Sequence, residues 1–176
     1  MKRECKAVCG LLEAYREGFW QEGTSLFYGK RLNGPEKLGV LARPEEVEAG
    51  VVNGVPMPMG YGSGIEDMAY HNGMLLWALV DAWEATGDEA LAAWVGRVFQ
   101  GLEGMARIAR TPGFIPRGPH PDGVHYYADT SLDQISLYAA GLCALYRSSL
   151  ATPAWRQAIR GIVRDTLSLL ARNGWR

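Results

Sequence analysis

The sequence carries one pattern twice: an acidic segment followed by a long amphipathic stretch. The first copy begins with SGIED at 63–67, and the second with TSLDQ at 130–134, which is 67 residues later (130 − 63). In both copies apolar residues then recur every three or four positions, which predicts an α-helix with one apolar face. Helical hairpins that repeat at this length bury their apolar faces against neighbouring repeats. The repeat therefore predicts an all-α fold built from antiparallel α/α hairpins.

Helix end signals support this fold class. Gly87 is a typical helix stop, Asp88 can cap the next helix, and Thr152 followed by Pro153 is a strong helix start. Together with the periodicity, these signals predict five main helices, at residues 2–20, 65–86, 89–110, 131–149 and 154–172.

The lengths of the connections predict how the helices are oriented. Short turns near 87 and 151 lie at one end, and the long loops 21–62 and 111–130 lie at the other. Helices 65–86 and 131–149 should therefore run parallel, with their N-termini at the long-loop end, while the other three run the opposite way. The segment 21–62 is rich in Gly and Pro, but its apolar residues favour an ordered loop over a disordered linker. Pro44 is expected to begin one helical turn within it.

Length and composition bound the class of protein. The 176 residues suffice for a single domain spanning 1–176, with 48% apolar and 21% charged residues. With a formal net charge of −1 and no basic stripe, neither nucleic acid nor a membrane surface is an expected partner. No signal peptide or transmembrane span is predicted, so a cytoplasmic location is expected; the alternative is a signal that has been removed.

The cysteines favour a reducing compartment. Three cysteines, Cys5, Cys9 and Cys143, fit free thiols better than a disulfide framework. Cys5 and Cys9 share one helix face, but a structural zinc site needs four ligands. No metal and no cofactor are therefore expected.

Four segments carry a resemblance to a known superfamily. They are GIED at 64–67, ATGD at 85–88, GFIPR at 113–117 and YADTSLDQ at 127–134. With them, the chain from residue 60 to 175 resembles the six-hairpin (α/α)6-toroid glycosidases, a superfamily that includes the unsaturated glucuronyl and rhamnogalacturonyl hydrolases. The resemblance implies an inner ring of parallel helices whose N-terminal carboxylates face a sugar cleft. Six hairpins need about twice this length, so the chain corresponds to a partial toroid within a larger one.

Carboxylates are the candidate catalytic groups, because glycoside cleavage needs one carboxyl to protonate the leaving oxygen and another to activate water or attack. Asp133 and Asp67 are the predicted pair. The structural alternative is that Asp133 completes a capping box begun by Thr130. Glu66 has the same alternative through Ser63, and is the better candidate for a cap.

Further residues are expected around the cleft. Arg117 could hold a uronate carboxylate through a bidentate fork, or be a solvated loop residue. The segment from His120 to His125 is explained as a turn rather than a metal site. The aromatic candidates are either sugar-stacking platforms or buried loop anchors: Tyr61, Phe114, Tyr126 and Tyr127. The remaining substrate-binding candidates are Tyr61, Glu66, His71, His120, Tyr126, Tyr127, Asp129 and Gln134. Four tryptophans are expected to pack between helices: Trp77, Trp83, Trp94 and Trp155.

The sequence thus favours a glycoside hydrolase that acts on oligosaccharides, including uronic-acid-containing ones. The alternative is a non-catalytic helical-repeat module that binds a protein partner or a sugar, or an inactive fragment. If the toroid is incomplete, exposed helix faces should cause self-association.

Overall fold

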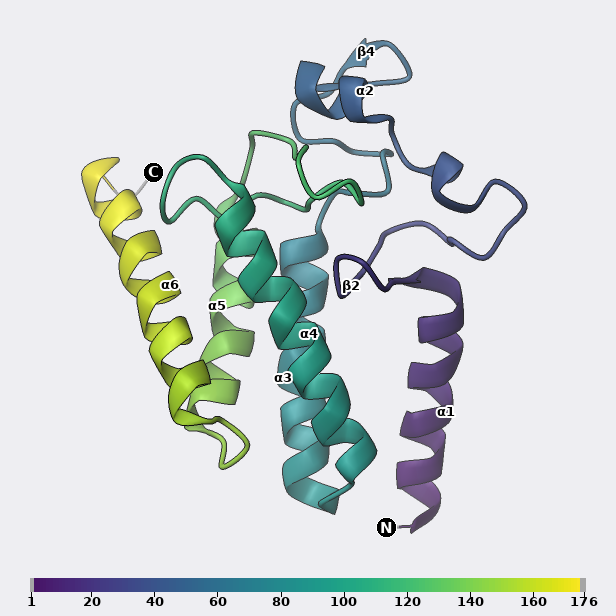
Figure 1. Ribbon diagram of the computed structural model, residues 1–176, viewed down its shortest axis with the longest axis vertical. Helices are drawn as coiled ribbons and strands as arrows, with labels where there is room; N and C mark the ends of the chain where they lie inside the picture. Colours follow the sequence, from purple (N-terminus) through teal and green to yellow (C-terminus); the bar gives the residue numbers. More distant parts are fainter. Residues whose placement is uncertain (1, 175–176) are drawn as a thin grey trace.

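A computed structural model describes residues 2–174, and the side chains from residue 10 onward (Figure 1). The mainly-α class is confirmed, and the five predicted helices are present with ends shifted by three residues or fewer. The long helices are α1 (Lys2–Phe19), α3 (Met68–Thr86), α4 (Glu89–Ile108), α5 (Leu132–Arg147) and α6 (Pro153–Arg172). Figure 1 shows α3 and α5 running in one direction and α1, α4 and α6 in the other, as the loop lengths predicted.

The predicted helix ends at the short turns are confirmed. Gly87 ends α3 in the left-handed conformation, with φ of 66°. The Asp88 carboxylate accepts a hydrogen bond from the backbone N–H of Ala90 at the start of α4. The Thr152 hydroxyl accepts one from Trp155 N–H, with Pro153 as the first residue of α6. Local sequence therefore sets these boundaries.

The helices α3 and α5 approach closely because glycines lie at their crossing. A Cβ atom on Gly73 would lie 2.4 Å from the carbonyl oxygen of Leu137. A Cβ atom on Gly141 would lie 2.2 Å from the carbonyl oxygen of Gly73. Both distances are far below van der Waals contact, so neither position has room for a larger residue.

Alanine at Gly141 is expected to lower the free energy of unfolding by about 2 kcal/mol, because a backbone carbonyl cannot rotate away as a side chain can. Chemical denaturation measures the change. Gly104 in α4 is the matched control, since nothing lies within 4 Å of its added Cβ. Alanine at Gly104 should stabilise the protein by about 0.5–1 kcal/mol through helix propensity. Equal effects of the two substitutions would contradict the close crossing.

The capping box predicted at Ser63 and Glu66 is wrong, because α3 begins only at Met68. The Ser63 hydroxyl donates to Glu66 Oε2 over 3.0 Å. The same carboxylate accepts the backbone N–H groups of Gly62 and Gly64. Glu66 therefore closes a loop ahead of the helix instead of capping it.

The capping box predicted at Thr130 is also wrong. The residue before α5 is Ser131, and its hydroxyl hydrogen-bonds to Asp133. The Thr130 hydroxyl is buried and makes no hydrogen bond to any described residue. Asp133 is thus not part of a box with Thr130.

The long segment 21–62 is ordered, as expected, and begins its helical turn α2 (Pro44–Ala49) at Pro44. It also holds the 3-10 turn η1 (Lys37–Val40) and strands that were not predicted. The hairpins pair β1 (Trp20–Gln21) with β2 (Leu26–Phe27), and β3 (Val51–Val52) with β4 (Val55–Pro56). Asn53 and Gly54 have φ of 51° and 76°, which is the tight-turn chemistry of a two-residue hairpin.

Asn72 of α3 binds the hairpin of β1 and β2 through hydrogen bonds. This side chain is fully buried in α3, donates to the carbonyl of Phe27 and accepts from the N–H of Phe27, each over 2.9 Å. The bidentate pairing satisfies the buried backbone of β2. The long segment is thereby held against α3.

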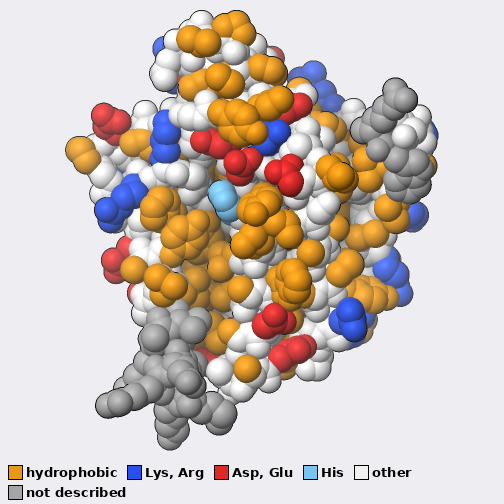
Figure 2. Space-filling model, turned by 180° about the vertical axis from the view of Figure 1, so that it is seen from behind, with side chains coloured by type: hydrophobic (Ala, Val, Ile, Leu, Met, Phe, Trp, Pro, Cys, Tyr) orange, Lys and Arg blue, Asp and Glu red, His pale blue; other side chains and the backbone are white. Residues whose placement is uncertain are grey.

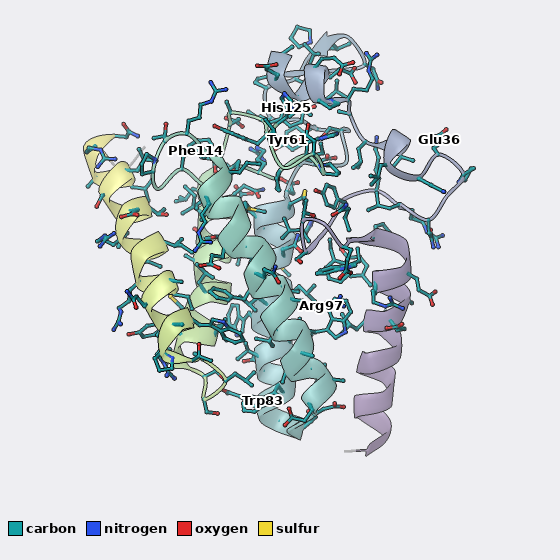
Figure 3. The ribbon with its side chains drawn as sticks, viewed as in Figure 1. Glu36, Tyr61, Trp83, Arg97, Phe114 and His125 are labelled. Atoms are coloured by element: carbon teal, nitrogen blue, oxygen red, sulfur yellow. The ribbon has the colours of Figure 1, made fainter. Side chains whose placement is uncertain are left out.

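Aromatic side chains join α1 to the same region. The Tyr15 ring stacks on Phe27 at a centroid distance of 4.7 Å. The Arg97 guanidinium lies 5.1 Å from the Trp94 ring and 5.5 Å from the Trp20 ring (Figure 3). These contacts pack the C-terminal half of α1 against β2, and Trp20 of β1 against α4. The Cys5 and Cys9 side chains lie outside the described ones.

The tryptophans divide into two groups. Trp83, Trp94 and Trp155 pack against the core, as expected. Trp77 does not, because 46% of it is exposed on α3. The prediction for Trp77 was wrong, since the side of α3 that carries it is open to solvent.

Candidate functional site

The centre of the candidate site is a buried arginine that binds two carboxylates. Arg117 Nη1 donates to Asp67 Oδ1 over 3.0 Å, and Nε donates to Asp129 Oδ2 over 3.1 Å. Arg117 is only 3% exposed, whereas the Asp67 and Asp129 side chains are 33% and 30% exposed. The guanidinium is therefore internal, while the carboxylates reach the surface.

Gln134 completes this group by linking the two parallel helices. Its Nε2 donates to Asp67 Oδ1 over 2.6 Å, and its Oε1 accepts from Tyr70 N–H over 3.0 Å. Asp67 and Gln134 occupy equivalent positions of the repeat (67 + 67 = 134). The spacing of 67 residues can be read from the sequence, but it does not indicate that Asp67 and Gln134 form a hydrogen bond with each other. We call Arg117, Asp67, Asp129 and Gln134 the Arg117 cluster.

The backbone of Asp67 explains why its carboxylate is available to the cluster. Asp67 is the N-cap of α3 but adopts the left-handed conformation, with φ of 57° and no side-chain capping bond. This conformation costs a non-glycine residue about 1–2 kcal/mol. The charge-assisted hydrogen bond that Arg117 donates to Asp67 offsets that cost.

Arg117 is fixed from several sides. Its carbonyl accepts from Ala69 N–H in the first turn of α3 over 2.8 Å. A Cβ atom on Gly118 would lie 2.4 Å from the carbonyl oxygen of Ile65, so the loop that carries Arg117 is in close contact with the segment just before α3. The guanidinium also lies 5.2 Å from the ring centroid of Tyr61, which is 47% exposed. This contact has cation–π geometry.

These contacts correct both expectations for Arg117. It is not a solvated loop residue, and its Nε and Nη1 already bind carboxylates rather than presenting a free fork to a uronate. Burial by itself would lower the pKa of Arg117. The hydrogen bond to Asp129 and the negative charges around it outweigh burial and raise the pKa, so the guanidinium stays charged.

Asp133 lies in the first turn of α5 and is exposed. The hydrogen bond from the Ser131 hydroxyl lowers its pKa, with further lowering from the N–H of Gln134 and the charge of Arg117. The carboxyl is therefore ionised at neutral pH. An ionised, exposed carboxylate can accept a proton from water or act as a nucleophile, but it is a poor proton donor.

The remaining candidates lie around the long loops. Figure 3 shows Tyr61, Phe114 and His125 at that end of the helices, and Trp83 near the other end. Tyr127 is fully buried, and its hydroxyl donates to Val51 O over 3.0 Å, so it is a loop anchor. The half-buried Tyr126 accepts from Arg110 N–H over 3.2 Å.

Two of the histidines, His120 and His125, belong to a turn in the second long loop, and the third, His71, lies on α3. The turn interpretation of 120–125 is confirmed, because Asp122 Oδ1 accepts from Val124 N–H and His125 N–H, and Asp122 Oδ2 contacts the His125 ring. His120 Nδ1 accepts from Asp122 N–H within the same turn. His71 instead lies exposed on α3, one turn after Asp67. Among residues 10–174, whose side chains the structure describes, no group of three or more His, Cys, Asp or Glu residues is arranged to hold a metal.

Figure 2 shows the molecule from behind the view of Figure 1. Acidic side chains gather around a basic one near the upper centre, beneath the projecting loop region, and a broad hydrophobic surface continues below them. Three hollows share no residue with the Arg117 cluster: one of about 1140 Å³ along α5 and α6, one of about 570 Å³ beside α4 and residues 23–26, and one of about 370 Å³ between α4 and α6. In the described part of the chain, no helix is both long and apolar enough to cross a membrane.

Comparison with known proteins identifies no family for this chain. No protein-family model matches the sequence, and no curated protein or solved structure matches it significantly. The similarity to six-hairpin glycosidases therefore stays a prediction.

Proposed function

We propose that this chain is a carbohydrate-active protein of the glycoside hydrolase type, forming part of an α/α toroid. The observation that supports the proposal is the Arg117 cluster. It joins the carboxylate of Asp67, at the N-terminal end of α3, with that of Asp129, in the loop just before α5, and it leaves both partly exposed beside the aromatic ring of Tyr61. Partly exposed carboxylates beside an aromatic ring suit the binding of sugar hydroxyls and ring faces.

The proposed chemistry uses two carboxylates. Asp133 is ionised, so it takes the proton of an attacking water or attacks the anomeric carbon directly. Asp67, oriented by Arg117 and Gln134, is the second carboxylate and stabilises the positive charge that develops on the sugar ring. The leaving oxygen takes its proton from solvent water as its bond to the anomeric carbon breaks. His71 and Tyr61 contact the sugar. Arg117 keeps Asp67 and Asp129 in place and is a positioning residue in this scheme.

Binding is tested first, with a panel of neutral and uronate oligosaccharides. A ligand that binds only the folded chain at a hundred times its Kd stabilises by about 2.7 kcal/mol, which raises Tm by about 5–10 °C in a chain of this size. Tyr61→Ala should reduce this rise, because it removes an exposed ring beside the cluster. Val124→Ala, in an exposed loop position, is the control and should leave it unchanged. Absence of a rise with every sugar would contradict the proposal.

A non-catalytic binding module is the second candidate. It is favoured by exposed apolar residues on the helices, such as Leu11 and Leu132, which are 74% and 75% exposed. Patches of this kind mark protein interfaces when they are contiguous. Sedimentation equilibrium distinguishes the two candidates: concentration-dependent self-association without any sugar binding supports the module.

A further inference from the structure

The helix α3 has an apolar side that the described chain leaves partly open to solvent. Apolar residues occur all round this helix, a pattern typical of a helix buried on every side. Yet Met74 and Trp77 are 44% and 46% exposed, and His71 and Ala78 are exposed as well. The other side of α3 packs tightly, with Gly73 against α5 and Asn72 against β2.

This open side leads away from the Arg117 cluster. Within α3, positions 71, 74 and 78 recur every three or four residues, and Trp77 follows Met74 by three residues on the adjoining part of the surface. Asp67 precedes the first turn of this helix as its N-cap. At 1.5 Å of rise per residue, Trp77 lies about 15 Å along the axis from Asp67. That length spans several linked sugar rings.

The chemistry of the open side differs from that of the cluster. Between Asp67 and Asp81, α3 carries no Asp, Glu, Lys or Arg. An indole or thioether side chain stacks on the C–H face of a sugar ring, whereas a uronate carboxylate would be desolvated there without a partner. The exposed surface therefore suits a neutral ring and disfavours a charged one.

We propose that Met74 and Trp77 form a distal subsite for a neutral sugar ring of an extended oligosaccharide whose other end lies at the Arg117 cluster. The inference rests on the proposed function, because it names the substrate class of that same site. Its consequence is a preference for chains long enough to reach from Asp67 to Trp77.

The test is calorimetric titration of the whole chain with cello-oligosaccharides, from disaccharide to pentasaccharide. Affinity should rise with length and then level off once Trp77 is covered. Trp77→Ala should weaken pentasaccharide binding by about tenfold and leave the disaccharide unchanged, and Trp77→Phe should recover part of the loss. Leu167→Ala, at a 48% exposed position on α6, is the matched control and should change neither ligand.

The outcomes separate this inference from the proposed function. If the disaccharide and pentasaccharide bind equally well, or lose equal affinity in Trp77→Ala, the distal subsite is overturned while sugar binding at the cluster stands. If no oligosaccharide of any kind binds, the proposed function fails, and the subsite with it. If Trp77→Ala instead converts a dimer to a monomer in sedimentation, the open side of α3 is a protein interface, and the subsite is overturned.

Discussion

Replacing Asp133 with asparagine is expected to lower turnover of a cleavable oligosaccharide by about 10²- to 10⁴-fold, the usual contribution of a positioned acid or base. Asparagine keeps the size of the side chain but has no charge with which to take a proton. Because Asp133 is exposed, the free energy of unfolding should change by less than about 1 kcal/mol. Release of reducing ends measures turnover, and circular dichroism on heating measures stability.

The pH profile gives a second readout for the same residue. Activity that needs ionised Asp133 is present above the pKa of this carboxyl and is lost as the pH falls through it. Since the Ser131 hydroxyl lowers that pKa, the acid limb should fall below the ordinary value of 3.8. Asp81→Asn, at an exposed position on α3, is the control and should keep turnover. Full turnover in Asp133→Asn, with a large loss of stability, would show that Asp133 serves the helix N-terminus instead.

Replacing Arg117 with methionine is expected to lower the free energy of unfolding by about 3 kcal/mol, the low end for breaking a buried ion pair. The low end applies because Asp67 and Asp129 are about one third exposed, so water can solvate them once the guanidinium is gone. Asp67 also loses the charge-assisted hydrogen bond that offsets the cost of its left-handed backbone, and keeps only the one from Gln134. Urea denaturation measures the change.

Two comparisons define the cause of that loss. Arg110→Met, at an exposed position near the start of the same loop, should change stability by less than about 0.5 kcal/mol. Combining Arg117→Met with Asp67→Asn and Asp129→Asn should recover part of the loss, because the stranded carboxylates are then neutral. Strict additivity of the three substitutions would show that the cluster is not a coupled unit.

The helical framework could be predicted because its signals are local. Gly87, Asp88 and Thr152 act within one or two turns of their own position, and their roles were confirmed. The orientation of the helices followed from loop length. The hairpin of β3 and β4 also has a local signal, since Asn53-Gly54 between valines strongly favours a tight turn.

The site was only partly predictable. Asp67, Asp129, Gln134 and Arg117 were all candidates, but their mutual binding joins residues far apart in the chain. The capping-box pattern at Ser63 failed because Glu66 found closer partners in its own loop. Tyr127 could not be told from Tyr61 by sequence, because burial depends on which segment passes over the ring.

The sequence by itself determined the helices, their ends and their direction, because periodicity and capping act over a few residues. Tertiary structure alone decided that Arg117 is internal, that Trp77 is exposed and that Asp67 adopts a left-handed backbone. The physical reason is that burial and ion pairing depend on neighbours brought in by long loops and by the glycine contact between α3 and α5. No local pattern records those neighbours.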